Sequence, residues 1–170
     1  MKSRLRSSSL TISLGFFVVL SASFGGCSAD SQSDSAPVTV TQTVVTSYSA
    51  SFQKGTNGYT GAIDTYLSQS ASTTNYGTAT VLVADGDEPY NSGNDASPML
   101  RWDVSSIPTD ATVSSVTIRF RVTDGSTNTY SMYPLNRAWT ESGATWTNAS
   151  SETAWQTAGA QGSLDRGTTS

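Results

Sequence analysis

The sequence contains no histidine and only one cysteine, Cys27, in its 170 residues. Without histidine it can build neither a Ser-His-Asp or Cys-His triad nor a histidine zinc site. A single cysteine excludes an internal disulfide. Asp87, Asp103 and Glu141 could supply the two acids of a glycoside hydrolase, but nothing around them marks an acid with a shifted pKa. We therefore expect no enzymatic activity.

Charged residues are also scarce, at 13 %, whereas Ser, Thr, Asn and Gly are abundant. This mixture is typical of an extracellular β-protein. Residues 1–26 hold three of the nine basic residues and no acidic one, which leaves 6 basic against 13 acidic residues, a balance of −7, for the rest. A chain that acidic is a poor partner for nucleic acid or anionic lipid.

The N-terminus has the features of an export signal over residues 1–26. A basic start, residues 1–6, precedes an apolar stretch over residues 10–24, which is too short to span a membrane as a helix. The following Gly25-Gly-Cys27 resembles the bacterial lipobox, although Phe24 stands where leucine is usual. The resemblance implies lipidation of Cys27 and an extracytoplasmic, lipid-anchored position on the cell envelope. The alternative is ordinary cleavage and secretion, with Cys27 as a leftover residue.

Residues 27–51 read as a Ser/Thr-rich tether, and residues 52–170 as one domain. Within the tether, residues 38–48 alternate weakly and can form a short edge strand. No internal repeat is visible.

The clearest strand signal lies in residues 114–122. Val116, Ile118, Phe120 and Val122 alternate with polar residues, and this period of two predicts a half-buried strand. A shorter strand, residues 99–104, precedes it with Leu100 and Trp102 on one face. Further strands are expected over residues 63–67, 79–84 and 129–135. The pattern predicts an all-β fold, an antiparallel β-sandwich.

Three segments resemble the DNRLRE domains, which are disaggregatase-related modules grouped with carbohydrate-binding module family 96. The segments are Leu100-Arg-Trp-Asp-Val-Ser-Ser-Ile-Pro108 with residues 111–118, Asp64-Thr-Tyr-Leu with residues 74–80, and Arg137-Ala-Trp-Thr-Glu-Ser-Gly-Ala-Thr-Trp146 with Trp155. The resemblance implies a jelly-roll-like, non-catalytic domain that binds an extracellular polysaccharide. In that family further strands follow the segment matching Asp165. We therefore expect a sandwich that is incomplete at its C-terminus, whose missing partner is a C-terminal segment or a catalytic domain.

Aromatic and arginine side chains are the candidate sugar contacts. Trp102 is expected in the core, and Trp139 and Trp146 are expected to anchor their segment to the sandwich. The residues expected to stack on sugar rings at the surface are Tyr76, Tyr90 and Tyr133. Arg119 and Arg121 lie on the polar face of their strand, where they can bind carboxylates of an acidic polysaccharide or pair with local acids across the sheet.

The long polar loop over residues 85–97 is the candidate metal site. Asp85, Asp87, Glu88 and Asp95 offer the hard oxygen ligands that calcium prefers, so a structural calcium ion is the one cofactor considered. The spacing is not that of an EF-hand, because no glutamate stands at the twelfth position. The alternative is a solvated loop whose Asp, Asn and Gly residues make turns.

Together these features predict a non-catalytic carbohydrate-binding module, displayed on the cell envelope or secreted. The competing function is a structural spacer or adhesin-type surface domain with no sugar ligand.

Overall fold

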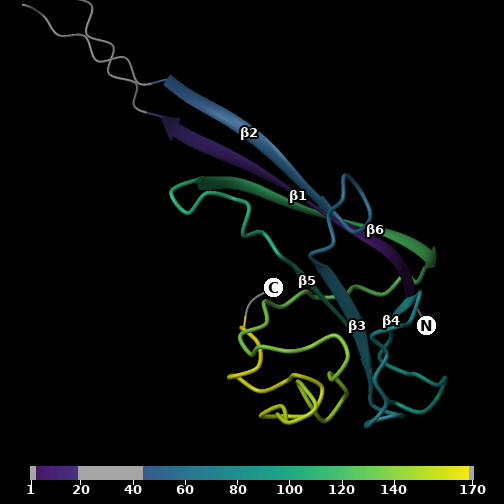
Figure 1. Ribbon diagram of the computed structural model, residues 1–170. Helices are drawn as coiled ribbons and strands as arrows, with labels where there is room; N and C mark the ends of the chain where they lie inside the picture. Colours follow the sequence, from purple (N-terminus) through teal and green to yellow (C-terminus); the bar gives the residue numbers. More distant parts are fainter. Residues whose placement is uncertain (1–2, 19–43, 169–170) are drawn as a thin grey trace, which may run out of the picture. The chain divides into compact units, whose positions relative to one another are not determined.

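The computed structural model describes residues 3–18 and 44–168, which contain six strands and no helix (Figure 1). The all-β prediction is therefore confirmed. Within these ranges, accordingly, no helix has the length and apolarity needed to cross a membrane. The strands are β1 (Ser3–Val18), β2 (Val44–Gln53), β3 (Ala62–Ser68), β4 (Leu82–Ala84), β5 (Ala96–Trp102) and β6 (Thr112–Asp124).

The chain divides into two compact units. The larger unit comprises Met1–Leu10, Phe52–Val104 and Ile118–Ser170. The smaller comprises Thr11–Ser51 and Ser105–Thr117, and holds the greater part of β2. All the candidate sites described below lie in the larger unit.

Strands β3 and β5 form the antiparallel centre of the larger unit. They pair in register from Ala62 opposite Trp102 to Ser68 opposite Ala96. Asp85, directly after β4, exchanges two backbone hydrogen bonds with Ala96, at 2.9 and 2.7 Å. The strands predicted over residues 63–67 and 99–104 are confirmed, with the second beginning three residues earlier than expected. The strand predicted over residues 79–84 is present only as the short β4.

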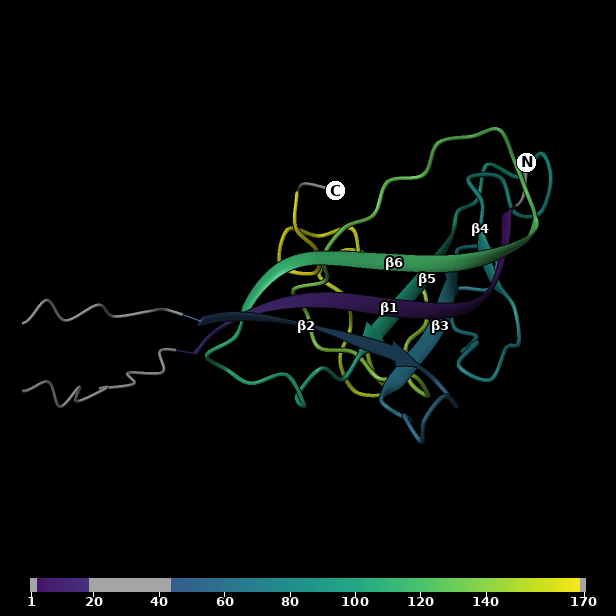
Figure 2. The same cartoon turned by 90° about the horizontal axis from the view of Figure 1, so that it is seen from above.

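Strand β1 pairs with β2, β4 and β6, and Figure 2 shows β1 and β6 side by side. Its first residues pair with β4 in antiparallel register, Ser3 opposite Ala84 and Leu5 opposite Leu82. The Thr123 hydroxyl of β6 donates to the Arg4 carbonyl at 3.2 Å. Strand β1 falls within the predicted export signal, which stays a prediction. Cys27 and residues 27–43 of the predicted tether lie outside the described residues.

The alternation in β6 predicts the strand correctly but its burial wrongly. Val116 and Val122 are each 54 % exposed, and Ile118 and Phe120 are only half-buried. A face this exposed is not packed against a second layer. The period of two reports the strand geometry, but it cannot report whether another sheet covers the apolar side.

The strand predicted over residues 129–135 is also absent. Residues 127–134 are exposed loop, and only Leu135 forms an isolated bridge, to Arg166. Pro134 has no N–H to donate to a neighbouring strand, which disfavours a ladder here.

The core lies between the β3–β5 pair and the irregular segment that follows residue 135. Leu67 of β3 and Met99 of β5 pack in one cluster with Trp139, Trp146 and Trp155. The predicted anchoring by Trp139 and Trp146 is therefore confirmed. The prediction that Trp102 is core is wrong, because Trp102 is only half-buried and another residue of the same strand, Met99, joins the core instead.

Candidate functional site

The segment over residues 139–160 has no regular strand, yet its turns are held in place around buried tryptophans. The Trp155 indole N–H donates to the Thr145 carbonyl at 2.9 Å. Gly159 donates its N–H to the Trp146 carbonyl at 2.7 Å, with a φ of 77°. A Cβ at Gly159 would lie 2.6 Å from the Trp146 ring. Glycine therefore allows both the left-handed backbone and the close approach to the indole.

Asp165 joins the last turns to the rest of the segment. Its fully buried carboxylate accepts hydrogen bonds from the N–H groups of Gln156, Thr157 and Gly162, at 3.0 to 3.2 Å, and from the Arg137 Nε at 2.5 Å. Burial alone raises the pKa of Asp165, but these four hydrogen bonds outweigh it and hold the pKa below its usual value. The buried charge is thus paired and fully bonded, as buried charges must be.

The loop around Asn75 packs against the start of this segment. The Asn75 side-chain amide donates to the carbonyls of Glu141 and Ala144, both at 2.8 Å. A side chain at Gly77 would collide with the Glu141 backbone. These contacts explain why Asn75 and Gly77 stand together in this part of the sequence.

One pair of acids lies close by. The Glu141 carboxylate accepts the Asp64 N–H at 3.1 Å and faces the Lys54 ammonium at 3.5 Å. Burial raises the pKa of Asp64, Lys54 lowers it, and Glu141 raises it further. Glu141 is therefore engaged in holding β3 and the chain before it.

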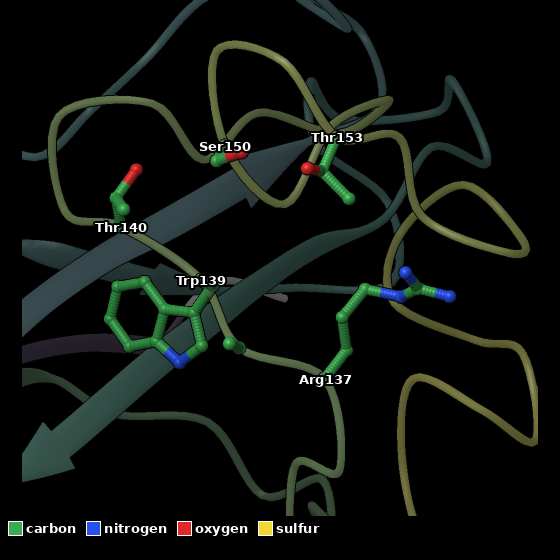
Figure 3. A pocket seen from close by; sticks show the side chains of 6 residues that line it. Arg137, Trp139, Thr140, Ser150 and Thr153 are labelled. Carbon is green, nitrogen blue, oxygen red and sulfur yellow. The ribbon is translucent and has the colours of Figure 1, made fainter.

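A hollow of about 370 Å³ opens on the segment (Figure 3). Figure 3 shows the Trp139 ring and the Arg137 side chain directed to opposite sides, with the hydroxyl-bearing residues on the neighbouring turns. We call this hollow the Trp139 pocket. It is lined by Arg137, Ala138, Trp139, Thr140, Ser150 and Thr153.

Backbone hydrogen bonds fix the three hydroxyl-bearing residues of the Trp139 pocket. Thr140 donates its N–H to the Ala149 carbonyl at 3.1 Å, and the Thr153 carbonyl accepts from Ala149 at 2.7 Å and from Ser150 at 3.2 Å. Arg101 donates to the Trp139 carbonyl at 3.2 Å, and its guanidinium lies 5.6 Å from the centre of the Trp139 ring. The turns are therefore set before any ligand arrives.

The chemistry of the Trp139 pocket suits a hydroxyl-rich ligand. Threonine and serine hydroxyls both donate and accept hydrogen bonds. Its volume lies within the roughly 300–1,000 Å³ of small-molecule sites. The residues that line it include no carboxylate. This composition can bind and orient a ligand but holds no acid–base pair.

The structure does not gather the predicted sugar contacts in one place. Arg119 and Arg121 are exposed on β6, and Tyr90 is 82 % exposed on the loop after β4. Tyr76 is half-buried and stacks on Tyr66, with ring centres 4.1 Å apart. Burial, followed by the charge of Tyr76, raises the pKa of Tyr66 to about 12.

Tyr133 is 40 % exposed and is the predicted contact nearest in sequence to the Trp139 pocket. The Arg166 guanidinium lies over its ring, 4.3 Å from the centre.

The predicted calcium ligands lie on one loop but do not converge. The Asp85 carboxylate accepts the Asp87 N–H at 3.0 Å, and the Asp87 carboxylate accepts from Asn91 and Gly93, both at 2.7 Å. The hydrogen bonds from Gly93 and Asn91 lower the pKa of Asp87. Asp95 pairs through its backbone with Gln69, and Glu88 is half-buried. No group of three or more metal-binding side chains occurs in the described part of the chain.

Sequence reasoning missed the polar residues of the Trp139 pocket. The sequence identifies the segment from Arg137 to Trp146 as part of the family resemblance, but it predicts a packing role only for the tryptophans. Thr140, Ser150 and Thr153 carry no local signal, because hydroxyl residues are abundant throughout the chain.

Comparison with known proteins bears directly on this unit. No curated protein and no solved structure matches the chain. A known family does match, over residues 56–163, more than half of the 170 residues and including every residue that lines the Trp139 pocket. Such modules bind carbohydrate without catalysis, which agrees with the expectation of no enzymatic activity. The chain belongs to carbohydrate-binding module family 96.

Proposed function

We propose that the Trp139 pocket is the place where this module binds an extracellular polysaccharide, in the manner of a DNRLRE-type domain. The family match carries the proposal that the ligand is a carbohydrate. The pocket supports the location, since its three hydroxyl-bearing residues stand on preset turns beside an indole. Preset donors and acceptors reduce the ordering cost of binding a weak ligand.

An acidic polysaccharide is the ligand class that Arg119 and Arg121 favour. Both guanidinium groups are on the exposed face of β6 and can bind carboxylates bidentately. The balance of −7 outside the first 26 residues opposes the approach of a polyanion. At physiological salt the Debye length is about 8 Å, so contacts at the arginine pair can outweigh distant acids.

The test is affinity electrophoresis of the full chain in gels that contain alginate, pectin or a neutral β-glucan. We expect retardation by at least one polymer and its loss in Ser150→Ala with Thr153→Ala. Thr60→Ala, an exposed threonine outside the pocket, is the matched control and should keep wild-type mobility. If the double variant is still retarded, the carbohydrate site lies outside the pocket. Wild-type protein that is folded but unretarded by every polymer would favour the structural-spacer alternative.

Arg119→Ala with Arg121→Ala separates the two ligand classes. Weaker retardation by alginate or pectin, together with sensitivity to salt, supports an acidic ligand. Retardation by the neutral glucan alone would contradict it.

Display on the cell envelope is a further part of the proposal, supported by the export-signal pattern and the position of Cys27. Avidity along a repeating polymer would strengthen weak binding by a membrane-anchored layer of modules. Radioactive palmitate should label the wild-type chain in cells and not Cys27→Ser. Equal labelling of both would end the lipoprotein proposal.

Calcium in the Asp85–Asp95 loop also stays a proposal. Binding would require carboxylate oxygens that now accept N–H groups of the loop to turn toward the ion. Titration calorimetry should give heat with the wild type that is lost in Asp85→Asn and Asp87→Asn. Absence of heat from the wild type would refute it.

A further inference from the structure

A second surface is formed by Tyr133 and Arg166, and Asp165 links it to Arg137 of the Trp139 pocket. We propose that a further sugar ring of the same polysaccharide stacks on this Tyr133–Arg166 platform. The module would then bind an internal stretch of the polysaccharide across both surfaces. The inference rests on the proposed function and adds to it a subsite and a ligand of several sugar units.

Backbone hydrogen bonds hold the residues next to Tyr133 and Arg166. The Pro134 carbonyl accepts the Gly167 N–H at 2.8 Å, and Leu135 forms a bridge with Arg166. Arg166 donates its own N–H to the Gly162 carbonyl at 3.0 Å. Tyr133 thus directly precedes a short paired stretch, which limits the ordering cost of binding.

The pair offers the two kinds of contact that a pyranose ring needs. The guanidinium lies 4.3 Å from the centre of the Tyr133 ring, within the range of a cation–π contact, which fixes the ring orientation. Tyr133 is 40 % exposed, and the electron-rich face of a tyrosine ring attracts the C–H groups of a sugar face. The Arg166 guanidinium N–H groups beside the ring can donate to sugar hydroxyl oxygens or to carboxylate oxygens. They can therefore bind neutral and acidic sugars alike.

Asp165 connects the platform to the Trp139 pocket. Its carboxylate binds the side chain of Arg137, which lines the pocket, while the next residue, Arg166, covers Tyr133. The Asp165 carbonyl also accepts the N–H groups of Asn136 and Arg137, at 2.8 and 3.2 Å. The two surfaces therefore flank one buried carboxylate, which suits a polymer that contacts both.

Other large apolar residues close to the platform in sequence are also exposed. They are Tyr130 and Met132 on the same loop, and Leu164 near Arg166. Contiguous exposed apolar side chains are typical of a binding surface. The family favours a sugar as the occupant, and a protein partner is left as an outcome of the test.

The test compares Tyr133→Ala, Tyr133→Phe and Tyr48→Ala in the full chain, by affinity electrophoresis in alginate, pectin and β-glucan. Loss of a stacking ring should weaken binding roughly two- to tenfold in Tyr133→Ala. Tyr133→Phe keeps the ring and should bind like the wild type. Tyr48→Ala removes a more exposed tyrosine that belongs to the smaller unit, and it should have no effect.

A second measurement uses oligosaccharides of different lengths, cut from the polymer that retards the wild type. Tyr133→Ala should lower affinity for long fragments and leave that for the shortest bound fragment unchanged. Wild-type affinity of Tyr133→Ala for all lengths, with binding still lost in Ser150→Ala with Thr153→Ala, would overturn the platform and leave the pocket standing. A folded wild-type chain that no polymer retards would overturn both. Tyr133→Ala that alters only self-association in sedimentation would identify a protein contact instead.

Discussion

Asp165 is the residue on which the Trp139 pocket and the Tyr133–Arg166 platform both depend. One carboxylate satisfies three backbone N–H groups and one guanidinium, and all four come from turns rather than from a sheet. In a segment without a strand ladder, such a group replaces the hydrogen bonds that a ladder would supply.

Asp165→Ala should therefore lower the free energy of unfolding much more than a substitution at the surface. Removing one partner of a buried ion pair costs roughly 3–5 kcal/mol. Because the folded pKa is held below the unfolded value of about 3.9, the contribution of the carboxylate is complete above that pH and is lost as pH falls through the folded pKa. Thermal melts of Asp165→Ala and the exposed control Asp110→Ala, at pH 7 and pH 3, measure this. Equal melting temperatures for the two variants at pH 7 would contradict it.

Gly159 permits a second test on a single residue. Alanine there must adopt a left-handed backbone and also displace the Trp146 ring, so we expect a loss of roughly 2–4 kcal/mol. Gly93 has a similar φ of 65° but open space around it, and Gly93→Ala should cost only about 1–2 kcal/mol. Urea unfolding of both variants compares them. A Gly159→Ala loss no larger than that of Gly93→Ala would show that the indole moves freely.

At the scale of elements, β6 and β3 differ in what their apolar side chains contact. Val122 of β6 is 54 % exposed, whereas Leu67 of β3 is fully buried among the tryptophans. Val122→Thr should change the free energy of unfolding by about 0.5 kcal/mol or less. Leu67→Ala should cost about 2–5 kcal/mol. A large loss of unfolding free energy in Val122→Thr would mean that another layer covers β6 in the folded protein.

The strands could largely be predicted because they depend on local alternation. Residues 63–67, 99–104 and 114–122 carry that pattern, and β3, β5 and β6 form there. The strand expected over residues 129–135 fails because a strand also needs a partner, which no local pattern supplies. The Trp139 pocket is similarly non-local, since Arg137 is tied to Asp165, 28 residues away. Its tryptophans could be found from sequence, but its hydroxyl lining could not.

For the whole molecule, the observed pairing of the N-terminus is incompatible with cleavage of the predicted export signal. Residues 3–10 lie in the larger unit, paired with β4 through Ser3, Arg4 and Leu5 and bonded to β6 through Thr123. The same residues read as the beginning of an export signal. Cleavage before Cys27 would remove the strand that β4 and β6 share.

Removal of residues 1–27 should therefore weaken the larger unit and expose the edges of β4 and β6. Each cross-strand pair contributes roughly 0.2–1 kcal/mol, and the three pairs with β4 account for only part of what is lost. The chain beginning at Ser28 should melt at a lower temperature than the full chain carrying Cys27→Ser, and should bind more of a hydrophobic dye. A synthetic peptide of residues 3–18 should reverse both changes, whereas a scrambled peptide should not. Identical, cooperative melts of the two chains without dye binding would show that β1 adds nothing to the fold. In that case β4 and β6 are stable without it, and the exported module needs no strand from another source.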